Sequence, residues 1–486
     1  MEPLHLRFGG GTSETVLNPF VLFLVVVVGV LTLCWPRRKV IAPVIAAFIL
    51  IPMDQVLLIG GMHFPMLRFL ALFGIARLVW SKLSVRCPIF SGGVNKIDLA
   101  VIGFALVTGL AGVLLFQEMG AMVYQLGNIY TIFSVYFLLR YLIRDESDVL
   151  QAIRTLAWVA AVVAVLMTWE VITGRNPYAL LGGAQAADYA TAMARDNRFR
   201  ATGCFAHPIL AGTFGAILIP LFVLLWQSCK TSRTMAVVGI VSATVITVAS
   251  NSSTPIVAYA AGVLGLCLWP ARNWMRFLRW AIVVAVVSLH LVMKAPVWHL
   301  IARIDLAGGS SSYHRFMVVD QCIRHFSDWW LVGVKSTYEW GWDMWDTANQ
   351  YVSICDCSGL LAFILFLATI VYGFKYLGKA RRHAGSRRHQ FFLWALGAAL
   401  LANVVAFVGI SYTDQIQVVW YGLLAAISAT AVLHPKRESI PVSSRAYSQV
   451  PARVVTPFTG AEGDMENDAF ETVPPGYRTD QRQLTL

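Results

Sequence analysis

Charged residues are scarce in this sequence. Of its 486 residues only 13% are charged and 57% are hydrophobic, and the mean hydropathy is +0.65. So little charge excludes an ordinary soluble protein, and several apolar runs reach the roughly 20 residues that a helix needs to cross a bilayer. Backbone groups inside lipid find no water, so each span must satisfy its own hydrogen bonds as a helix. The composition predicts an all-α polytopic membrane protein.

The motifs of several common activities are missing. The sequence has no HExxH, no GxSxG and no glycine-rich nucleotide loop in a βαβ context, which argues against a zinc protease, a serine hydrolase and a nucleotide-binding enzyme. Ionisable residues within or beside the apolar runs are also sparse, the main ones being Asp54, Arg68 and Glu170. An ion-coupled carrier usually needs more charged groups at the midplane of the bilayer.

Metal ligands at a usable spacing are lacking too. Cys355 and Cys357 form a C-x-C pair without nearby partners, which is weak evidence for zinc. The histidines of the polar segments follow no ligand pattern; these are His207, His299, His314 and His325. We therefore expect neither a metal site nor another cofactor.

What the sequence does contain is a series of about 12–13 apolar segments long enough for transmembrane helices, within residues 1–434. They begin near Pro19, Val40, Phe64, Ile97, Met122, Ala152, Pro208, Met235, Thr254, Leu278, Gly359, Phe391 and Gln415. Residues 435–486 lose this pattern, are rich in Ser, Thr and Pro, and read as a disordered cytoplasmic tail.

The positive charges define an orientation. The net charge is +12, but Lys and Arg gather in short loops between apolar segments, as in 37–39 and 381–388, which indicates topology and not nucleic-acid binding. These loops fall on one side, which the positive-inside rule makes cytoplasmic. The two long polar segments, 174–207 and 295–358, then face outward.

The longer outer segment contains a predicted amphipathic helix over residues 313–326. Its apolar face would carry Phe316, Val319, Cys322, Ile323 and Phe326, with Asp320 and Arg324 on the opposite face. Arg315 falls on the apolar side. It either reaches outward along that face or binds an anion in a membrane cavity.

The shorter outer segment carries arginines where they are normally scarce. Arg198 and Arg200 precede Pro208, which suits the first position of a helix. Closely spaced arginines before a helix N-terminus favour a phosphate group. Chance clustering or anchoring at the membrane interface is the alternative.

Three blocks of these two outer segments resemble the superfamily of O-antigen ligases and Wzy-type polysaccharide polymerases of bacterial inner membranes. The first is residues 200–212, RATGCFAHPILAG. The second joins SYHR at 312–315 with WLVG at 330–333, and the third joins NQY at 349–351 with GLL at 359–361. The blocks lie in the family's order over residues 198–375.

The resemblance implies a GT-C-like membrane glycosyltransferase that needs no metal. It implies transfer of a glycan from undecaprenyl pyrophosphate to a sugar hydroxyl at the outer face of the bacterial inner membrane. It also implies a flippase and a chain-length regulator of the same pathway as partners, besides the lipid bilayer.

We expect residues of both outer segments to form the active site. Arg315 and Arg200, with Arg198, would bind the pyrophosphate, and His314 or Asp346 would act as the base. For Asp346, capping of the following helix is an equal alternative. Asn349, Tyr351, Trp342 and Trp345 would contact the sugars, although Trp and Tyr also form ordinary interfacial belts.

One departure from the family pattern bears on the activity. The ligases carry a His immediately before the Asn, and here that position is Ala348. We therefore expect a polymerase of exopolysaccharide or O-antigen repeat units. A ligase that joins finished glycan to lipid A–core or to protein is the first alternative. A transporter or flippase of lipid-linked sugars is the second, although the sequence lacks the internal repeats typical of one.

Overall fold

The computed structural model describes residues 15–52, 55–59, 62–84, 89–181, 194–195, 198–303, 311–413 and 415–431. These residues are mostly helical, and eight of their helices are long and apolar enough to cross a membrane. The predicted class, a helical multi-pass membrane protein, is thereby confirmed. The predicted tail from residue 435 and the middle of the 174–207 segment lie outside the described residues.

The eight long apolar helices occur at predicted positions. They are α4 (Lys96–Phe116), α5 (Met119–Leu142), α6 (Glu146–Thr173), α8 (Pro208–Ser228), α9 (Arg233–Ala249) with the 3-10 turn η2 (Lys230–Ser232), α11 (Met275–Val292), α14 (Gln350–His383) and α15 (Arg387–Ala406). The other predicted segments form α1 (Pro19–Cys34), α2 (Arg37–Leu50), α3 (Met66–Ser84), α10 (Ser253–Cys267) and α16 (Gln415–Thr430). A helix thus lies near every predicted start.

The polar segments fold into short elements. These are the 3-10 helices η1 (Pro177–Leu181), η3 (Val297–Arg303) and η4 (Tyr338–Trp340), the helices α12 (Ser311–Arg324) and α13 (Phe326–Trp329), and two antiparallel hairpins, β1 (Val56–Ile59) with β2 (Met62–Pro65) and β3 (Ala194–Arg195) with β4 (Arg198–Phe199). The hairpins correct a strictly all-α prediction. In the long outer segment, residues 350–358 are also helical, and a break at Gly359 separates them from the apolar part of α14, whose start was predicted at this glycine.

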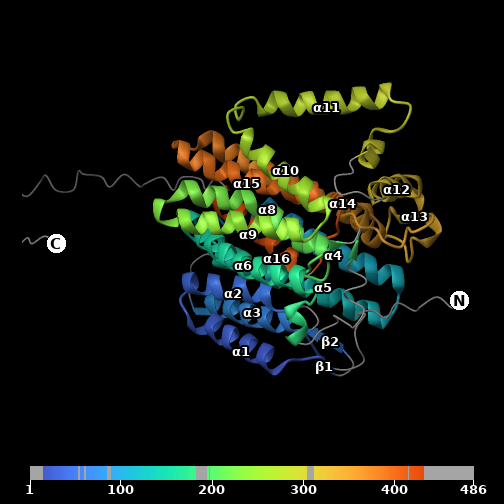
Figure 1. Ribbon diagram of the computed structural model, residues 1–486. Helices are drawn as coiled ribbons and strands as arrows, with labels where there is room; N and C mark the ends of the chain where they lie inside the picture. The colour runs from blue at the N-terminus through green and yellow to red at the C-terminus, as the bar shows by residue number, and fades with distance from the viewer. Residues whose placement is uncertain are drawn as a thin grey trace, which may run out of the picture. The chain divides into compact units, whose positions relative to one another are not determined.

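Helix α8 is the centre of the bundle, packed against α6, α9, α10 and α15 (Figure 1). Its apolar stretch is 83% buried. Glycines allow this close packing: a Cβ on Gly215 would lie 2.5 Å from the carbonyl oxygen of Ala243, and one on Gly212 would lie 2.2 Å from the Ser250 hydroxyl. Helix α11 is the opposite case. It is apolar enough to span a membrane, yet none of its residues is buried.

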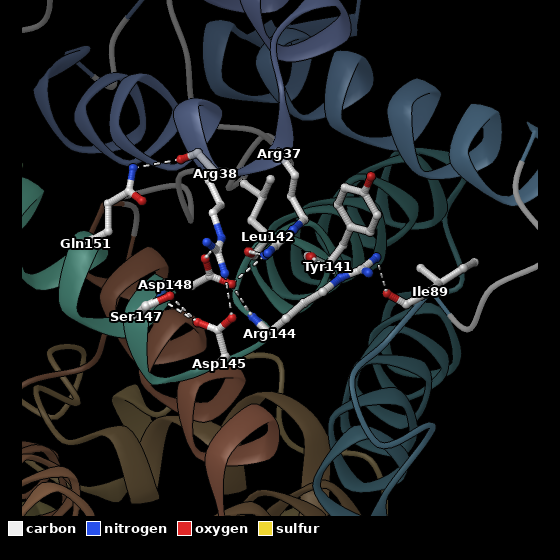
Figure 2. Close-up of polar contacts among 10 residues, drawn as sticks. All are labelled: Arg37, Arg38, Ile89, Tyr141, Leu142, Arg144, Asp145, Ser147, Asp148 and Gln151. Atoms are coloured by element: carbon white, nitrogen blue, oxygen red, sulfur yellow. Dashed lines mark hydrogen bonds and ion pairs between the residues drawn. The ribbon is translucent and has the colours of Figure 1, made fainter. Parts of the chain in front are cut away.

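Ion pairs connect the start of α2 with the junction of α5 and α6 (Figure 2). The carboxylate of Asp148 is buried; it accepts a hydrogen bond from Arg37 at 2.5 Å and one from the backbone N–H of Arg144 at 3.0 Å. Arg38 lies 3.3 Å from Asp148 and 3.0 Å from Asp145. These arginines belong to the loops that define the predicted cytoplasmic side. Their ion pairs also hold α2 against the junction of α5 and α6.

Candidate functional site

A serine-rich turn between α9 and α10 is contacted by both outer segments. Ser250, Ser252 and Ser253 are buried, and Asn251 takes the left-handed conformation with φ 43° that Asn tolerates well. The Thr254 hydroxyl donates to the carbonyl of Gly409 at 3.2 Å. This turn was not among the predicted site residues, although SNSSTP visibly interrupts two apolar runs.

Two of the predicted arginines donate hydrogen bonds to adjacent serines of this turn. Nη2 of Arg200 donates to Oγ of Ser252 at 2.7 Å, and Nη1 of Arg315 donates to Oγ of Ser253 at 3.1 Å. The structure therefore brings these two guanidinium groups, which come from different outer segments, to the start of α10. Arg198 lies in β4, but its side chain is outside the described part of the chain.

A buried carboxylate fixes the loop that carries Arg200. Glu170, near the end of α6, is fully buried and accepts hydrogen bonds from the backbone N–H groups of Thr202 at 3.0 Å and Gly203 at 2.8 Å. Asn176 donates to the carbonyl of Gly203 at 2.9 Å. Gly203 has φ +58°, which favours glycine. Glu170 therefore positions Arg200, a role that its place in the sequence did not reveal.

His207 connects this loop to the central helix. It is the N-cap of α8, and its Nδ1 accepts the backbone N–H of Ile209 at 3.2 Å. Pro208 occupies the first helical position, as predicted. Burial and the nearby positive charge of Arg200 lower the pKa of His207 to about 4. The imidazole is therefore neutral near pH 7, as an accepting Nδ1 requires.

Helix α12 holds Arg315 through a buried face that differs from the predicted one. Phe316, Val318 and Cys322 are buried, whereas Ile323 is 49% exposed. Asp320 was predicted on the polar face but is 7% exposed; it accepts from Trp298 Nε1 at 3.0 Å. The reason is that η3 packs on this side of α12. Phe326, 46% exposed, leaves the predicted face because α12 ends at Arg324.

His314 and Asp346, the two predicted bases, lie next to each other. The Nε2 atom of His314 is 3.0 Å from the backbone carbonyl of Asp346, and its Nδ1 is 3.9 Å from the carboxylate of Asp343. A carbonyl only accepts, so Nε2 carries the proton and Nδ1 is the basic atom of the neutral ring. The Asp346 carboxylate is exposed. Asp343 was not among the predicted site residues.

The residues predicted to contact sugars are divided between the interior and the surface. Asn349 is 2% exposed and caps α14 by accepting the N–H groups of Tyr351 at 2.9 Å and Val352 at 3.2 Å. Asn349, and not Asp346, is therefore the cap. The Tyr351 hydroxyl donates to the carbonyl of Val404 at 2.9 Å. Trp342 and Trp345 are 92% and 62% exposed, so only these two can meet a ligand without rearrangement.

The second and third sequence blocks interlock through two glycines. Gly333 (φ +92°) approaches α14 so closely that a Cβ would lie 2.3 Å from the carbonyl oxygen of Asp356. Gly359 (φ +77°), where α14 is interrupted, would bring a Cβ within 2.5 Å of the carbonyl oxygen of Leu331. The N–H of Val334 donates to Asp356 O at 2.7 Å. The second and third blocks, which are distant in the sequence, thus pack directly against each other.

Comparison with known proteins adds no assignment: no family model matches the sequence, and no curated protein matches it. Within the described residues, no group of three or more His, Cys, Asp or Glu side chains is arranged to hold a metal ion.

Proposed function

We propose that this chain is a membrane glycosyltransferase that polymerises oligosaccharide repeat units linked to undecaprenyl pyrophosphate. The observation that carries the proposal is the pair of hydrogen bonds from Arg200 and Arg315 to Ser252 and Ser253 at the start of α10. The resemblance of three sequence blocks to O-antigen ligases and Wzy-type polymerases supports the same reaction, because Arg200 belongs to the first of these blocks and Arg315 to the second.

A pyrophosphate leaving group requires stabilisation of the negative charge that grows as the glycosidic bond breaks. Guanidinium groups suit phosphate because their planar N–H donors match its oxygens. The first turn of α10, a helix of 15 residues, adds backbone N–H groups and the positive end of the helix dipole. Among the described residues the Ser253 hydroxyl has no hydrogen-bond acceptor, so it can donate to a phosphate oxygen.

The acceptor sugar requires a base. His314 is the candidate, because Nδ1 carries its lone pair and faces the side of Asp343, whose carboxylate would stabilise the imidazolium after proton transfer. The imidazole would then fill the role that the ligases give to the His missing at Ala348. Trp342 and Trp345 would stack on sugar rings.

The reaction would take place at the outer face of a bacterial inner membrane. This orientation follows from the arginine-rich loops, among them Arg37 and Arg38, which would lie on the cytoplasmic side. The lipid carrier would stay in the bilayer while its pyrophosphate reaches the start of α10.

The test uses purified full-length protein in liposomes with a synthetic undecaprenyl-pyrophosphate repeat unit, with product sizes measured in the presence of a chelator. We expect Arg315→Ala to lower polymer formation by about 10²–10³, the typical effect of removing one charge-stabilising donor. Arg175→Ala is the control, because this exposed arginine lies on the same outer segment as Arg200.

Wild-type polymer length and rate in Arg315→Ala would refute the proposed role of this residue. Transfer of the glycan to added lipid A–core without chain growth would identify a ligase. Movement of the substrate across the bilayer without any bond formation would identify a flippase.

A further inference from the structure

We propose that Cys322 of α12 and Cys355 of α14 form a disulfide that fastens the Arg315-bearing helix to the bundle. The proposal uses the outward orientation that the proposed function requires, because only an extracytoplasmic segment meets an oxidising compartment. In the structure both residues are thiols.

The first observation is their shared location. Cys322 and Cys355 are 5% and 4% exposed and belong to one small buried cluster with Val318, Trp329 and Trp340, together with Met344 and Val352. This cluster is separate from the large core of the helical bundle. Helices α12 and α14, which carry these two cysteines, are in direct contact. The two residues therefore meet across the interface of α12 with the first part of α14.

The second observation is that both sides of this interface are fixed. Nε1 of Trp329 donates to the carbonyl of Cys322 at 2.7 Å, which ties the end of α12 to α13. The cap formed by Asn349 fixes the beginning of α14. A disulfide demands a narrow range of geometry, and a pair held this way loses little freedom when it is linked.

The linkage also has a mechanical role. Helix α12 carries Arg315, and apart from its contact with η3 it rests on the small cluster described above. A covalent bond at Cys322 limits how far α12 can move from α14, and so keeps Arg315 at Ser253. A disulfide adds proportionally more stability to a small buried cluster than to the large core of the bundle.

The chemistry is a thiol–disulfide exchange with the disulfide of an extracytoplasmic dithiol oxidase. One thiolate of the pair attacks that disulfide and forms a mixed disulfide, and the second thiolate then displaces the oxidase sulfur. The pair loses two electrons and two protons, and the oxidase disulfide becomes a dithiol. Because both thiols are buried in the folded chain, the exchange takes place while the chain folds.

The experiment maps cysteines on the full-length protein purified without reductant. The denatured protein is alkylated with light N-ethylmaleimide, reduced, alkylated with the heavy form and analysed by peptide mass spectrometry. We expect heavy label on Cys322 and Cys355 and light label on Cys204, a buried cysteine of the other outer segment that belongs to the large core and not to this cluster.

Cys355→Ser should convert Cys322 to light label, and a reductant should lower the melting temperature of the wild type but not of the Cys322→Ser/Cys355→Ser double variant. Light label on both cysteines of the wild type would overturn the proposal. So would heavy label that persists on Cys322 in Cys355→Ser, since it would indicate another partner. The labelling does not depend on activity, so its failure is distinct from a failure of the glycosyltransferase assay.

Discussion

Replacing Glu170 by Gln tests how the loop that carries Arg200 is held. The Oε1 atom of Glu170 accepts the N–H and the hydroxyl of Thr202, and Oε2 accepts the N–H of Gly203 at 2.8 Å. A glutamine keeps one acceptor oxygen, but its NH₂ group must then face a backbone N–H. The variant loses a hydrogen bond to a charged acceptor, and we expect a cost of about 1.5–3 kcal/mol in stability.

The assay is thermal unfolding of the purified protein in detergent, followed by polymer formation in liposomes. Glu118→Gln is the control, because it makes the same chemical change at an exposed N-cap whose side chain forms no capping hydrogen bond. We expect Glu170→Gln to lower both the melting temperature and the activity, and Glu118→Gln to leave both unchanged. A melting temperature of Glu170→Gln equal to that of the control would refute the reasoning.

Three further predictions concern other parts of the structure. Gly359→Ala should cost about 1–3 kcal/mol, because its φ and ψ are adopted almost only by glycine, and should lower the yield of monodisperse protein in size-exclusion chromatography, whereas Gly385→Ala, which has open space around it, should not. His207 has a folded pKa of about 4, below the usual value for His; protonation therefore favours the unfolded chain, and stability should fall as pH drops from about 6.5 toward 4. His207→Asn, which retains a capping side chain, should flatten this dependence in pH-resolved melting curves. Asp148→Asn should lower the melting temperature by removing the buried carboxylate beside Arg37, and an unchanged value would show that the cluster contributes nothing.

The helical bundle could be predicted because its signal is local. Each apolar run has to satisfy its own backbone in lipid, so hydropathy alone places α8 at Pro208 and α16 at Gln415. The same reasoning fails where lipid no longer dictates the outcome. The hairpin after Pro52 and the helical turn over residues 350–358 depend on contacts with other segments, and no hydrophobic periodicity predicts them.

The candidate site was predictable only in part. Closely spaced arginines on an outer segment are unusual, and this signal selected Arg200, whereas Arg315 was selected because it falls on the apolar face of a predicted helix. Their partners Ser252 and Ser253 are ordinary residues by composition, and only the packing of α9 against α8 brings them to the arginines. The predicted exposure of Asp320 on α12 was wrong, because helical periodicity does not reveal that η3 covers that side of the helix.

The contrast between α8 and α11 has a consequence for how this sequence can change over generations. Lipid tails are as apolar as leucine side chains, so one aliphatic residue can replace another along α11 with little penalty. In α8, an added methyl group at Gly212 or Gly215 collides with α9 or with the turn that follows it. We expect the sequence of α11 to drift among aliphatic residues while that of α8 remains nearly fixed.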